Sequence, residues 1–333
     1  MSAKKKKPKV KKADPGKDLL KGVLKGEVRA IARMISLAEA AKPESRDILA
    51  EVYRHAGGAH VVGLTGVPGC GKSTLACGLA MAIRETGRRV GIVAIDPSSP
   101  FSGGAILGDR VRMTELTGDD GVFIRSMATR GALGGLARSS LEAVDVLDAA
   151  GFDLILIETV GVGQDEVDVV RAAHTVVVIS APGLGDEIQA IKAGILEIAD
   201  IHVVSKCDRP DSNATISDLK GMLTLGVRTS GPHGGADTWR VPVVPTSAET
   251  VEGIDDLLAA IDGHAMHLAD TGAIEERRRQ ILEMRVLKTA EDIIRKDFRG
   301  KSDKLSGLMK SLRERTMDPH EAALKLLDRI KKD

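Results

Sequence analysis

The chain has 333 residues, 43% of them hydrophobic and 29% charged, a balance typical of an ordinary globular protein with one large domain and appendages, or with two small domains. No apolar run approaches the roughly 18 residues of a membrane-spanning helix, and no apolar secretory signal opens the chain, so we expect no membrane contact. The three cysteines are scattered and form no C-x-x-C pair, which favours a reducing cytoplasm.

The amino-terminal residues 1–17 form a lysine-rich tail. They carry eight lysines and one aspartate, a charge of +7, so that the remainder carries 1 − 7 = −6. Such a segment cannot bury apolar surface, and we expect it to be disordered and solvated. The acidic body disfavours nucleic acid as the main partner.

Residues 18–58 are expected to form an amino-terminal helical extension. Apolar residues recur at helical spacing from Asp18 to about Ala41, which predicts one helix there. A second helix is predicted from Pro43 or Glu44 to His55, and Gly57-Gly58 follows its end.

The stretch Gly66–Thr74 fits the P-loop pattern G-x-x-x-x-G-K-[ST]. An apolar, β-branched run at 60–65 precedes it and helical periodicity follows, which is the strand–loop–helix context that the pattern requires. Glycine at three loop positions allows backbone N–H groups to turn toward phosphate oxygens, and the following helix points its amino terminus at them. The predicted nucleotide-binding residues of the loop are Gly66, Val67, Pro68, Gly69, Cys70, Gly71, Lys72, Ser73 and Thr74.

From residue 60 onward strands and helices alternate, and several strands are continuous aliphatic runs, as expected for a parallel sheet covered on both faces. We predict a P-loop α/β domain at 59–267 with a mostly parallel sheet and helices on both faces. Strands are expected at 60–65, 89–95, 122–126, 154–158, 175–180, 202–205 and 241–245, and helices at 72–86, 109–117, 137–149, 187–199, 211–225 and 253–266.

A nucleotide hydrolase needs acidic side chains at strand ends to hold Mg²⁺ and its waters near the phosphates. Asp96 and Glu158 each end a predicted strand, Asp109 follows a glycine-rich stretch, and Ser73 supplies a hydroxyl. These four residues are the predicted Mg²⁺ ligands; for Asp96 and Asp109 a helix- or turn-capping role is the alternative. Gly161 completes an acid-x-x-Gly element whose N–H group would sense the γ-phosphate.

Base recognition is expected at two later strand ends. Ser205-Lys206-Cys207-Asp208 resembles the Asn-Lys-x-Asp element of GTPases, in which the carboxylate accepts the guanine N1–H and N2–H₂ groups. Ser205 departs from the usual asparagine and offers only part of an amide's hydrogen bonding, so Ser205→Asn is expected to tighten GTP binding. Ser247-Ala248 resembles the backbone element that contacts the guanine oxygen.

Beyond residue 270 the pattern is helical only, with helices predicted at 274–298, 304–315 and 319–330. Long helices cannot satisfy their apolar stripes alone, so they pack on the domain or against a second copy. We therefore assign residues 268–333 to a carboxyl-terminal helical arm.

Five stretches together resemble the MeaB/ArgK-like GTPases, the G-protein chaperones of adenosylcobalamin-dependent acyl-CoA mutases. They read GVPGCGKST, AIDPSSPFSGGAILGDRVRM, IRSMATRGALGGLA, ILIETVGVGQ and PGLGDEIQAIKAGILEIADI, and the resemblance as a whole extends over about 60–265. Within the last stretch, the segment from Pro182 to Asp200 looks like that family's extra switch loop, which communicates with the mutase.

The resemblance implies a GTPase that converts GTP and water to GDP and phosphate, slowly alone and faster on the mutase. It would gate adenosylcobalamin loading and protect or reactivate a mutase such as methylmalonyl-CoA mutase. It would also form a homodimer through the carboxyl-terminal arm, and a cobalamin adenosyltransferase is a further candidate partner. The catalytic residues would be Lys72, Asp96 and Glu158, with Lys192 placed when the partner docks. Separately, Gln164 follows the acid element at the offset expected of a water-orienting glutamine, and a mobile polar loop residue is the alternative.

Two alternative functions use the same loop. A nickel-type metallochaperone GTPase needs clustered metal ligands, and the sequence offers only His264-x-x-His267, which we interpret as a solvated helix face. A small-molecule kinase needs a lid with arginines, for which Arg125 and Arg130 are candidates, but nothing resembles an acceptor pocket.

Overall fold

The computed structural model describes residues 15–96, 116, 118–128, 138–159, 171–183, 198–224, 239–299 and 302–330. The chain divides into two compact units, Met1–Ile281 and Leu282–Asp333. The lysine-rich tail up to residue 14 lies outside the described residues, as do nearly all of the helices expected at 109–117 and 187–199.

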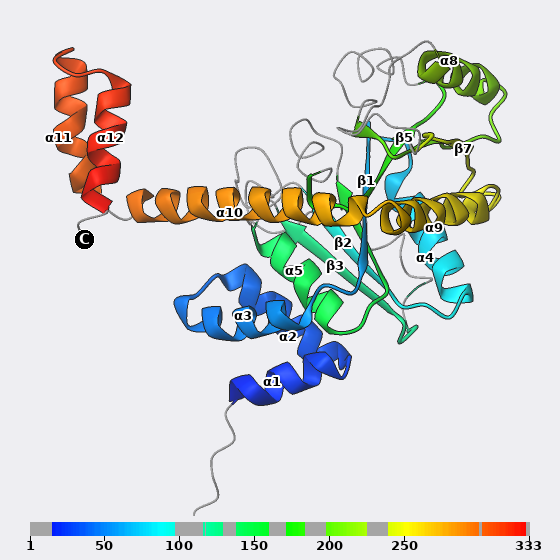
Figure 1. The fold of residues 1–333 in the computed structure, drawn as a ribbon, viewed down its shortest axis with the longest axis horizontal. Helices are drawn as coiled ribbons and strands as arrows, with labels where there is room; N and C mark the ends of the chain where they lie inside the picture. The colour runs from blue at the N-terminus through cyan, green and yellow to red at the C-terminus, as the bar shows by residue number, and fades with distance from the viewer. Residues whose placement is uncertain are drawn as a thin grey trace, which may run out of the picture. The chain divides into compact units, whose positions relative to one another are not determined.

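The first unit contains the predicted parallel sheet (Figure 1). Its seven strands lie in the order β3-β2-β4-β1-β5-β6-β7, and every neighbouring pair is parallel. All seven predicted strands are present, which confirms the fold class. The strands are β1 His60–Gly66, β2 Val90–Asp96, β3 Val122–Ala128, β4 Leu154–Thr159, β5 Thr175–Ser180, β6 Ile201–Val204 and β7 Val243–Pro245.

Helices cover both faces of the sheet, and adjacent residues of β2 show this directly. Ile92 belongs to the core formed with α4 (Lys72–Glu85) and α9 (Ile254–Asp270). Gly91 faces Leu147 of α5 (Arg138–Ala149) on the other side, since successive strand residues point to opposite faces. The helix α8 (Ser212–Thr224) contacts β6 and β7. Aliphatic strands are therefore buried on both faces, as their sequences indicate.

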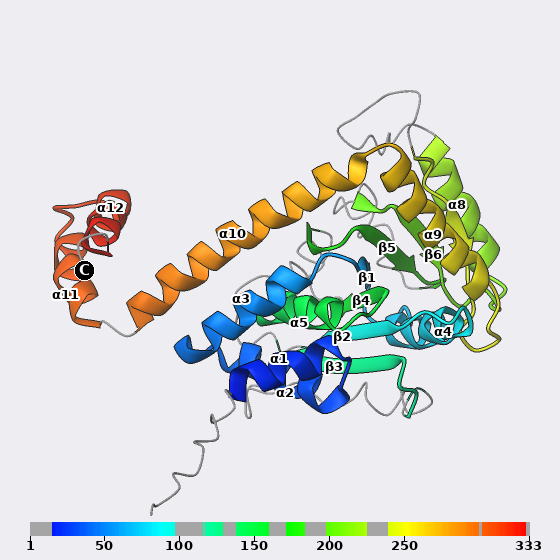
Figure 2. The same cartoon turned by 60° about the horizontal axis from the view of Figure 1, so that its bottom comes forward.

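The amino-terminal extension packs on α5, as Figures 1 and 2 show. It consists of α1 (Pro15–Leu24), α2 (Val28–Ala40), the short 3₁₀ helix η1 (Pro43–Ser45) and α3 (Arg46–His55). The prediction of one continuous helix over 18–41 is wrong. Gly26 has φ +74°, a left-handed conformation that interrupts the helix between α1 and α2.

Ion pairs fasten this extension to the sheet unit. Arg46 of α3 donates to Glu142 of α5 at 2.7 Å, and Arg125 of β3 pairs with Glu39 of α2. Arg125 is thus engaged in structure, whereas Arg130, the other arginine considered for a kinase lid, lies outside the described residues.

Three helices follow α9 along the chain: α10 (Ala273–Arg299), α11 (Ser302–Arg313) and α12 (Pro319–Ile330). The first begins in one unit and continues into the other. It exposes large apolar side chains, namely Leu282, Val286, Leu287, Ile293 and Ile294. Within the part of the chain that is described, no helix has both the length and the apolar character needed to cross a membrane.

Candidate functional site

The loop between β1 and α4 has the backbone geometry that the P-loop pattern demands. Gly66, Gly69 and Gly71 have φ angles of +147°, +80° and +93°, which L side chains rarely adopt. Gly66 is also sterically required, because a Cβ atom there would lie 2.1 Å from the carbonyl oxygen of Ile179 on β5. The β1 strand and α4 therefore position a glycine-rich loop at the amino terminus of a helix, a place that favours an anion.

Lys72 starts α4 and is 6% exposed, so its charge lies inside the loop rather than in solvent. Its Nζ donates to the carbonyl oxygens of Gly66 at 2.6 Å and Val67 at 3.0 Å. The thiol of Cys70 lies 4.0 Å from the same ammonium, and burial raises the pKa of this thiol. The ammonium thus places a positive charge inside the loop.

Glu158 and Ser73 meet beside the loop. Glu158 lies on β4 opposite Leu64 of β1, is 5% exposed, and its Oε1 accepts a hydrogen bond from the Ser73 hydroxyl. A serine hydroxyl and a carboxylate are hard oxygen donors of the kind that Mg²⁺ prefers, so this pair fits the ion that the sequence predicts. Asp96 ends β2, the neighbour of β4, although its side chain lies outside the described residues.

Four other predicted site residues fall outside the described part of the chain: Asp109, Gly161, Gln164 and Lys192. Their roles stay predictions. In the described residues no group of three or more His, Cys, Asp or Glu side chains is arranged to hold a metal ion.

Ser205 lies at the end of β6 and contacts the P-loop. Its side chain is 5% exposed, and its Oγ lies 2.6 Å from the carbonyl oxygen of Cys70 and 3.0 Å from that of Ser180 on β5. Lys206 follows with φ +54°, and its Nζ donates to the carbonyl oxygen of Gly69 at 2.9 Å. Ser205 and Lys206, in the segment predicted to recognise the base, thus contact two successive carbonyl groups of the P-loop, those of Cys70 and Gly69.

The second base-recognition segment is joined to the first by a hydrogen bond from Cys207 N–H to the carbonyl oxygen of Thr246 (3.0 Å). Ser247 is buried, and its N–H donates to the carbonyl oxygen of Glu252 at 2.9 Å. Val251 in this loop has φ +61°, unusual for a β-branched residue, and is 62% exposed. Such backbone conformations occur preferentially at functional loops.

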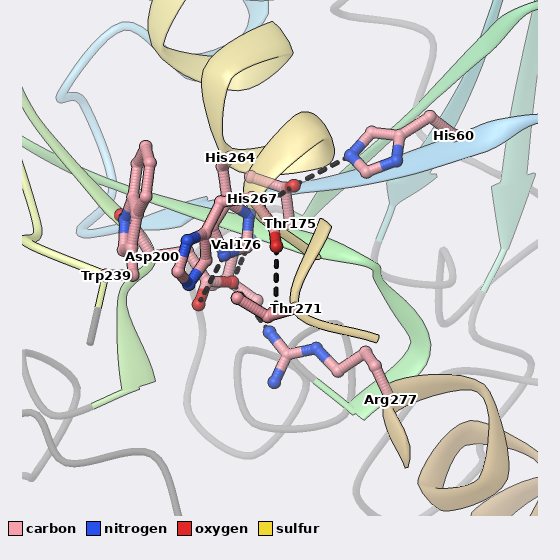
Figure 3. Close-up of polar contacts among 9 residues, drawn as sticks. All are labelled: His60, Thr175, Val176, Asp200, Trp239, His264, His267, Thr271 and Arg277. Atoms are coloured by element: carbon pink, nitrogen blue, oxygen red, sulfur yellow. Dashed lines mark hydrogen bonds and ion pairs between the residues drawn. The ribbon is translucent and has the colours of Figure 1, made fainter. Parts of the chain in front are cut away.

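His264 is not on a solvated helix face, and this expectation is wrong. It is 3% exposed, because α9 packs over β5 and β6, and its Nδ1 is hydrogen-bonded to Thr175 Oγ1 at 2.8 Å (Figure 3). Burial, followed by the positive charge of Arg277, lowers the pKa of His264 to about 3. Its ring also contacts Trp239, with the two ring centroids 4.9 Å apart. His264 is therefore a neutral, hydrogen-bonded residue of the core, and its contacts are structural.

Comparison with known proteins agrees with this geometry. The family model described as "Methylmalonyl Co-A mutase-associated GTPase MeaB" matches residues 31–303. The chain belongs to the MeaB family. It is a P-loop GTPase, and the nucleotide-binding loop and parallel sheet described above are those of this class.

Two relatives and one solved structure are similar to this chain. A Pyrococcus horikoshii protein, named as a GTPase, is 42% identical over 316 residues, spanning 95% of this chain and 98% of its own length. The mouse mitochondrial "Methylmalonic aciduria type A homolog" is 35% identical over 278 residues, 78% of this chain and 65% of the mouse protein. A crystal structure of "LAO/AO transport system kinase" shares the fold, with a TM-score of 0.70 at 23% identity, covering 97% of this chain and 99% of that one.

Proposed function

We propose that this MeaB-family GTPase is a chaperone of an adenosylcobalamin-dependent acyl-CoA mutase such as methylmalonyl-CoA mutase. GTP hydrolysis gates adenosylcobalamin loading and protects or reactivates the client enzyme. The observation that carries the proposal is the family match over residues 31–303, whose description names association with that mutase. The name of the mouse relative, which refers to methylmalonic aciduria, points in the same direction.

Hydrolysis in this site depends on positioning and electrostatics. The P-loop N–H groups hold the phosphates, and Lys72 neutralises charge on the β–γ bridge. Mg²⁺, when bound, supplies Lewis-acid charge to the phosphate oxygens, and Ser73, Glu158 and Asp96 are the residues that would hold it and its waters. The contact between Ser73 and Glu158 supports this assignment because it already brings two of these oxygen donors together.

Guanine recognition rests on Asp208 and the loop that follows β7. Asp208 lies in the loop that follows β6 and is exposed, so its carboxylate is available to the guanine N1–H and N2–H₂ groups. Because Ser247 N–H donates to Glu252, we assign the guanine oxygen to Ala248 N–H. We propose that Lys206 contacts the base with its side-chain stem while its Nζ donates to the Gly69 carbonyl oxygen of the P-loop.

We further propose that residues 59–267 are the GTPase domain and that the arm 268–333 forms a homodimer through the apolar side chains exposed on α10. We also propose that Lys192 becomes a catalytic residue when the mutase docks. A cobalamin adenosyltransferase is proposed as a second partner. Cys70, Cys77 and Cys207 form no disulfide in the described part of the chain, which suits the reducing cytoplasm in which we propose to place the protein.

The test is the transfer of adenosylcobalamin to the apo-mutase, followed by absorbance in the presence of this protein. We expect GTP and a non-hydrolysable GTP analogue to give different extents or rates of cofactor loading, and Lys72→Ala to remove that difference. Loading that is the same with GTP, with the analogue and without the protein contradicts the proposed function.

A further inference from the structure

A cluster of polar contacts lies at the amino-terminal ends of β5 and β6 (Figure 3). The P-loop follows β1 at the opposite, carboxyl-terminal end of these parallel strands. The centre of the cluster is the carboxylate of Asp200, whose Oδ2 accepts Val176 N–H at 2.8 Å and an Arg277 N–H at 2.6 Å. The Oδ1 atom lies 3.5 Å from His264 Nε2, and Trp239 Nε1 donates to the Asp200 carbonyl oxygen at 2.7 Å. We call these five residues, Val176, Asp200, Trp239, His264 and Arg277, the Asp200 hub.

The hub joins four elements through one largely buried carboxylate. Asp200 directly precedes β6, Val176 lies on β5, His264 lies on α9, and Arg277 lies in the second turn of α10. The Asp200 side chain is 20% exposed; burial raises its pKa, and the Arg277 guanidinium opposes that shift. Removing the cation from a buried carboxylate is strongly destabilising, so the Arg277 contact fixes the first turns of α10 against the start of β6.

Two adjacent strands connect the hub to the nucleotide loop. Thr175 Oγ1, at the start of β5, is hydrogen-bonded to His264 and, at 2.7 Å, to His60 Nε2 at the start of β1. The same strands end at the P-loop, where Gly66 of β1 pairs with Ile179 of β5. Six residue steps of a strand span about 20 Å, so β1 and β5 bridge the two sites directly.

The other end of this bridge is also tied to the P-loop by side chains. The Ser180 carbonyl oxygen at the end of β5 accepts hydrogen bonds from Ser205, whose hydroxyl also contacts the Cys70 carbonyl of the P-loop. The chain that leaves β5 beside the P-loop returns to the sheet through Asp200. Because Val176 of β5 donates its N–H to the Asp200 carboxylate, a displacement of β5 changes the contacts of that carboxylate.

We propose that the Asp200 hub couples the state of the bound nucleotide to the start of α10, with Asp200 and Arg277 as positioning residues. The inference rests on the proposed function only for the identity of the nucleotide. Coupling is reciprocal: if GDP and GTP bias the Asp200–Arg277 contact differently, then breaking the contact changes the ratio of the two affinities. If the contact serves only stability, breaking it lowers the unfolding free energy and leaves the ratio of the two affinities unchanged.

The first experiment measures dissociation constants for GDP and for a non-hydrolysable GTP analogue, with Mg²⁺, in the full chain. We expect Arg277→Gln to change the ratio of the two constants by at least about threefold. Arg279→Gln is the matched control, because Arg279 is 57% exposed and pairs with Glu276 on its own helix; its ratio stays at the parent value. Asp200→Asn should be non-additive with Arg277→Gln in a double-mutant cycle.

Should Arg277→Gln fold poorly, Arg277→Lys retains the charge and is expected to give a ratio between those of the parent and Arg277→Gln. An Arg277→Gln or Arg277→Lys protein whose thermal midpoint falls while its affinity ratio equals the parent's overturns the proposal.

The second experiment uses Trp239, the single tryptophan of the chain, as a reporter inside the hub. After labelling with 5-fluorotryptophan, we expect different ¹⁹F chemical shifts in the GDP and GTP-analogue complexes, and a reduced difference in Arg277→Gln but not in Arg279→Gln. Identical shifts in the two parent complexes overturn the coupling. Neither experiment contains a mutase, so failure of the coupling and failure of the proposed client are distinguishable.

Discussion

Removing the Ser205 hydroxyl tests how the base-recognition segment supports the phosphate loop. In Ser205→Ala the Cys70 carbonyl loses its contact with Oγ at 2.6 Å, whereas the Ser180 carbonyl keeps the Ser205 N–H donor at 2.8 Å. A buried hydrogen bond contributes about 1 kcal/mol net, and an acceptor left without a donor costs about 1–3 kcal/mol. We therefore expect the free energy of unfolding to fall by about 1–2 kcal/mol.

The same change should weaken nucleotide binding by about three- to tenfold, which corresponds to about 0.7–1.4 kcal/mol. The loss should be similar for GTP and ATP, because the hydroxyl contacts the loop backbone. Isothermal titration with both nucleotides and urea unfolding measure the two effects.

Ser45→Ala is the matched control, since Ser45 is also 5% exposed and its Oγ donates to the Lys42 carbonyl oxygen at 3.0 Å, in the amino-terminal extension. It should lose stability without losing affinity. A Ser205→Ala protein with parent affinity for both nucleotides refutes this reasoning, and so does one that loses only the preference for guanine.

The structure also revises the expectation for Ser205→Asn. An asparagine adds side-chain volume at a buried position that already contacts two carbonyl groups, and overpacking of this kind costs about 1–3 kcal/mol. The asparagine variant should therefore not bind GTP more tightly than the parent.

Two further predictions concern base selectivity and pH. Asp208→Ala should lower the ratio of GTP to ATP affinity by at least about tenfold, since a hydrogen-bonded carboxylate contributes about 1.5–3 kcal/mol, and an unchanged ratio in competition binding contradicts the assignment. Burial is the main cause that lowers the pKa of His60 to about 4 and of His174 and His264 to about 3. The unfolded chain therefore takes up protons below pH 6.5 that the folded chain does not, and stability should fall from pH 6.5 toward pH 4 by up to about 1.4 kcal/mol per pH unit for each histidine. The raised pKa of Asp200 opposes this trend at the acid end. Equal urea midpoints at pH 7.0 and pH 5.5 would show that these histidines are not held neutral.

The sheet and the P-loop could be predicted because their signals are local. Residues 66–74 form a contiguous pattern between a strand and a helix, and aliphatic runs such as 176–179 mark strands that are buried on both faces. The helix break at Gly26 could not be predicted, because the helical spacing of apolar residues continues across it. A single glycine in a sequence does not indicate whether its φ angle is positive.

Contacts between residues distant in sequence explain what could not be predicted. The Ser205 hydroxyl meets the carbonyl of Cys70, 135 positions away, and His264 meets Thr175, 89 positions away. Helical spacing places His264 and His267 on one side of α9, but only the packing of α9 over β5 decides that His264 is buried. For the Asp200 hub the sequence offered one hint, because Asp200 lies within the last of the five stretches that resemble the family.

Phosphate release from GTP, measured with and without a purified adenosylcobalamin-dependent acyl-CoA mutase, tests most directly whether this GTPase responds to a mutase. We predict that the mutase raises the hydrolysis rate of the parent protein by more than about tenfold and leaves Lys72→Ala inactive. A parent rate that is the same with and without every such mutase tested would show that this GTPase has a different partner.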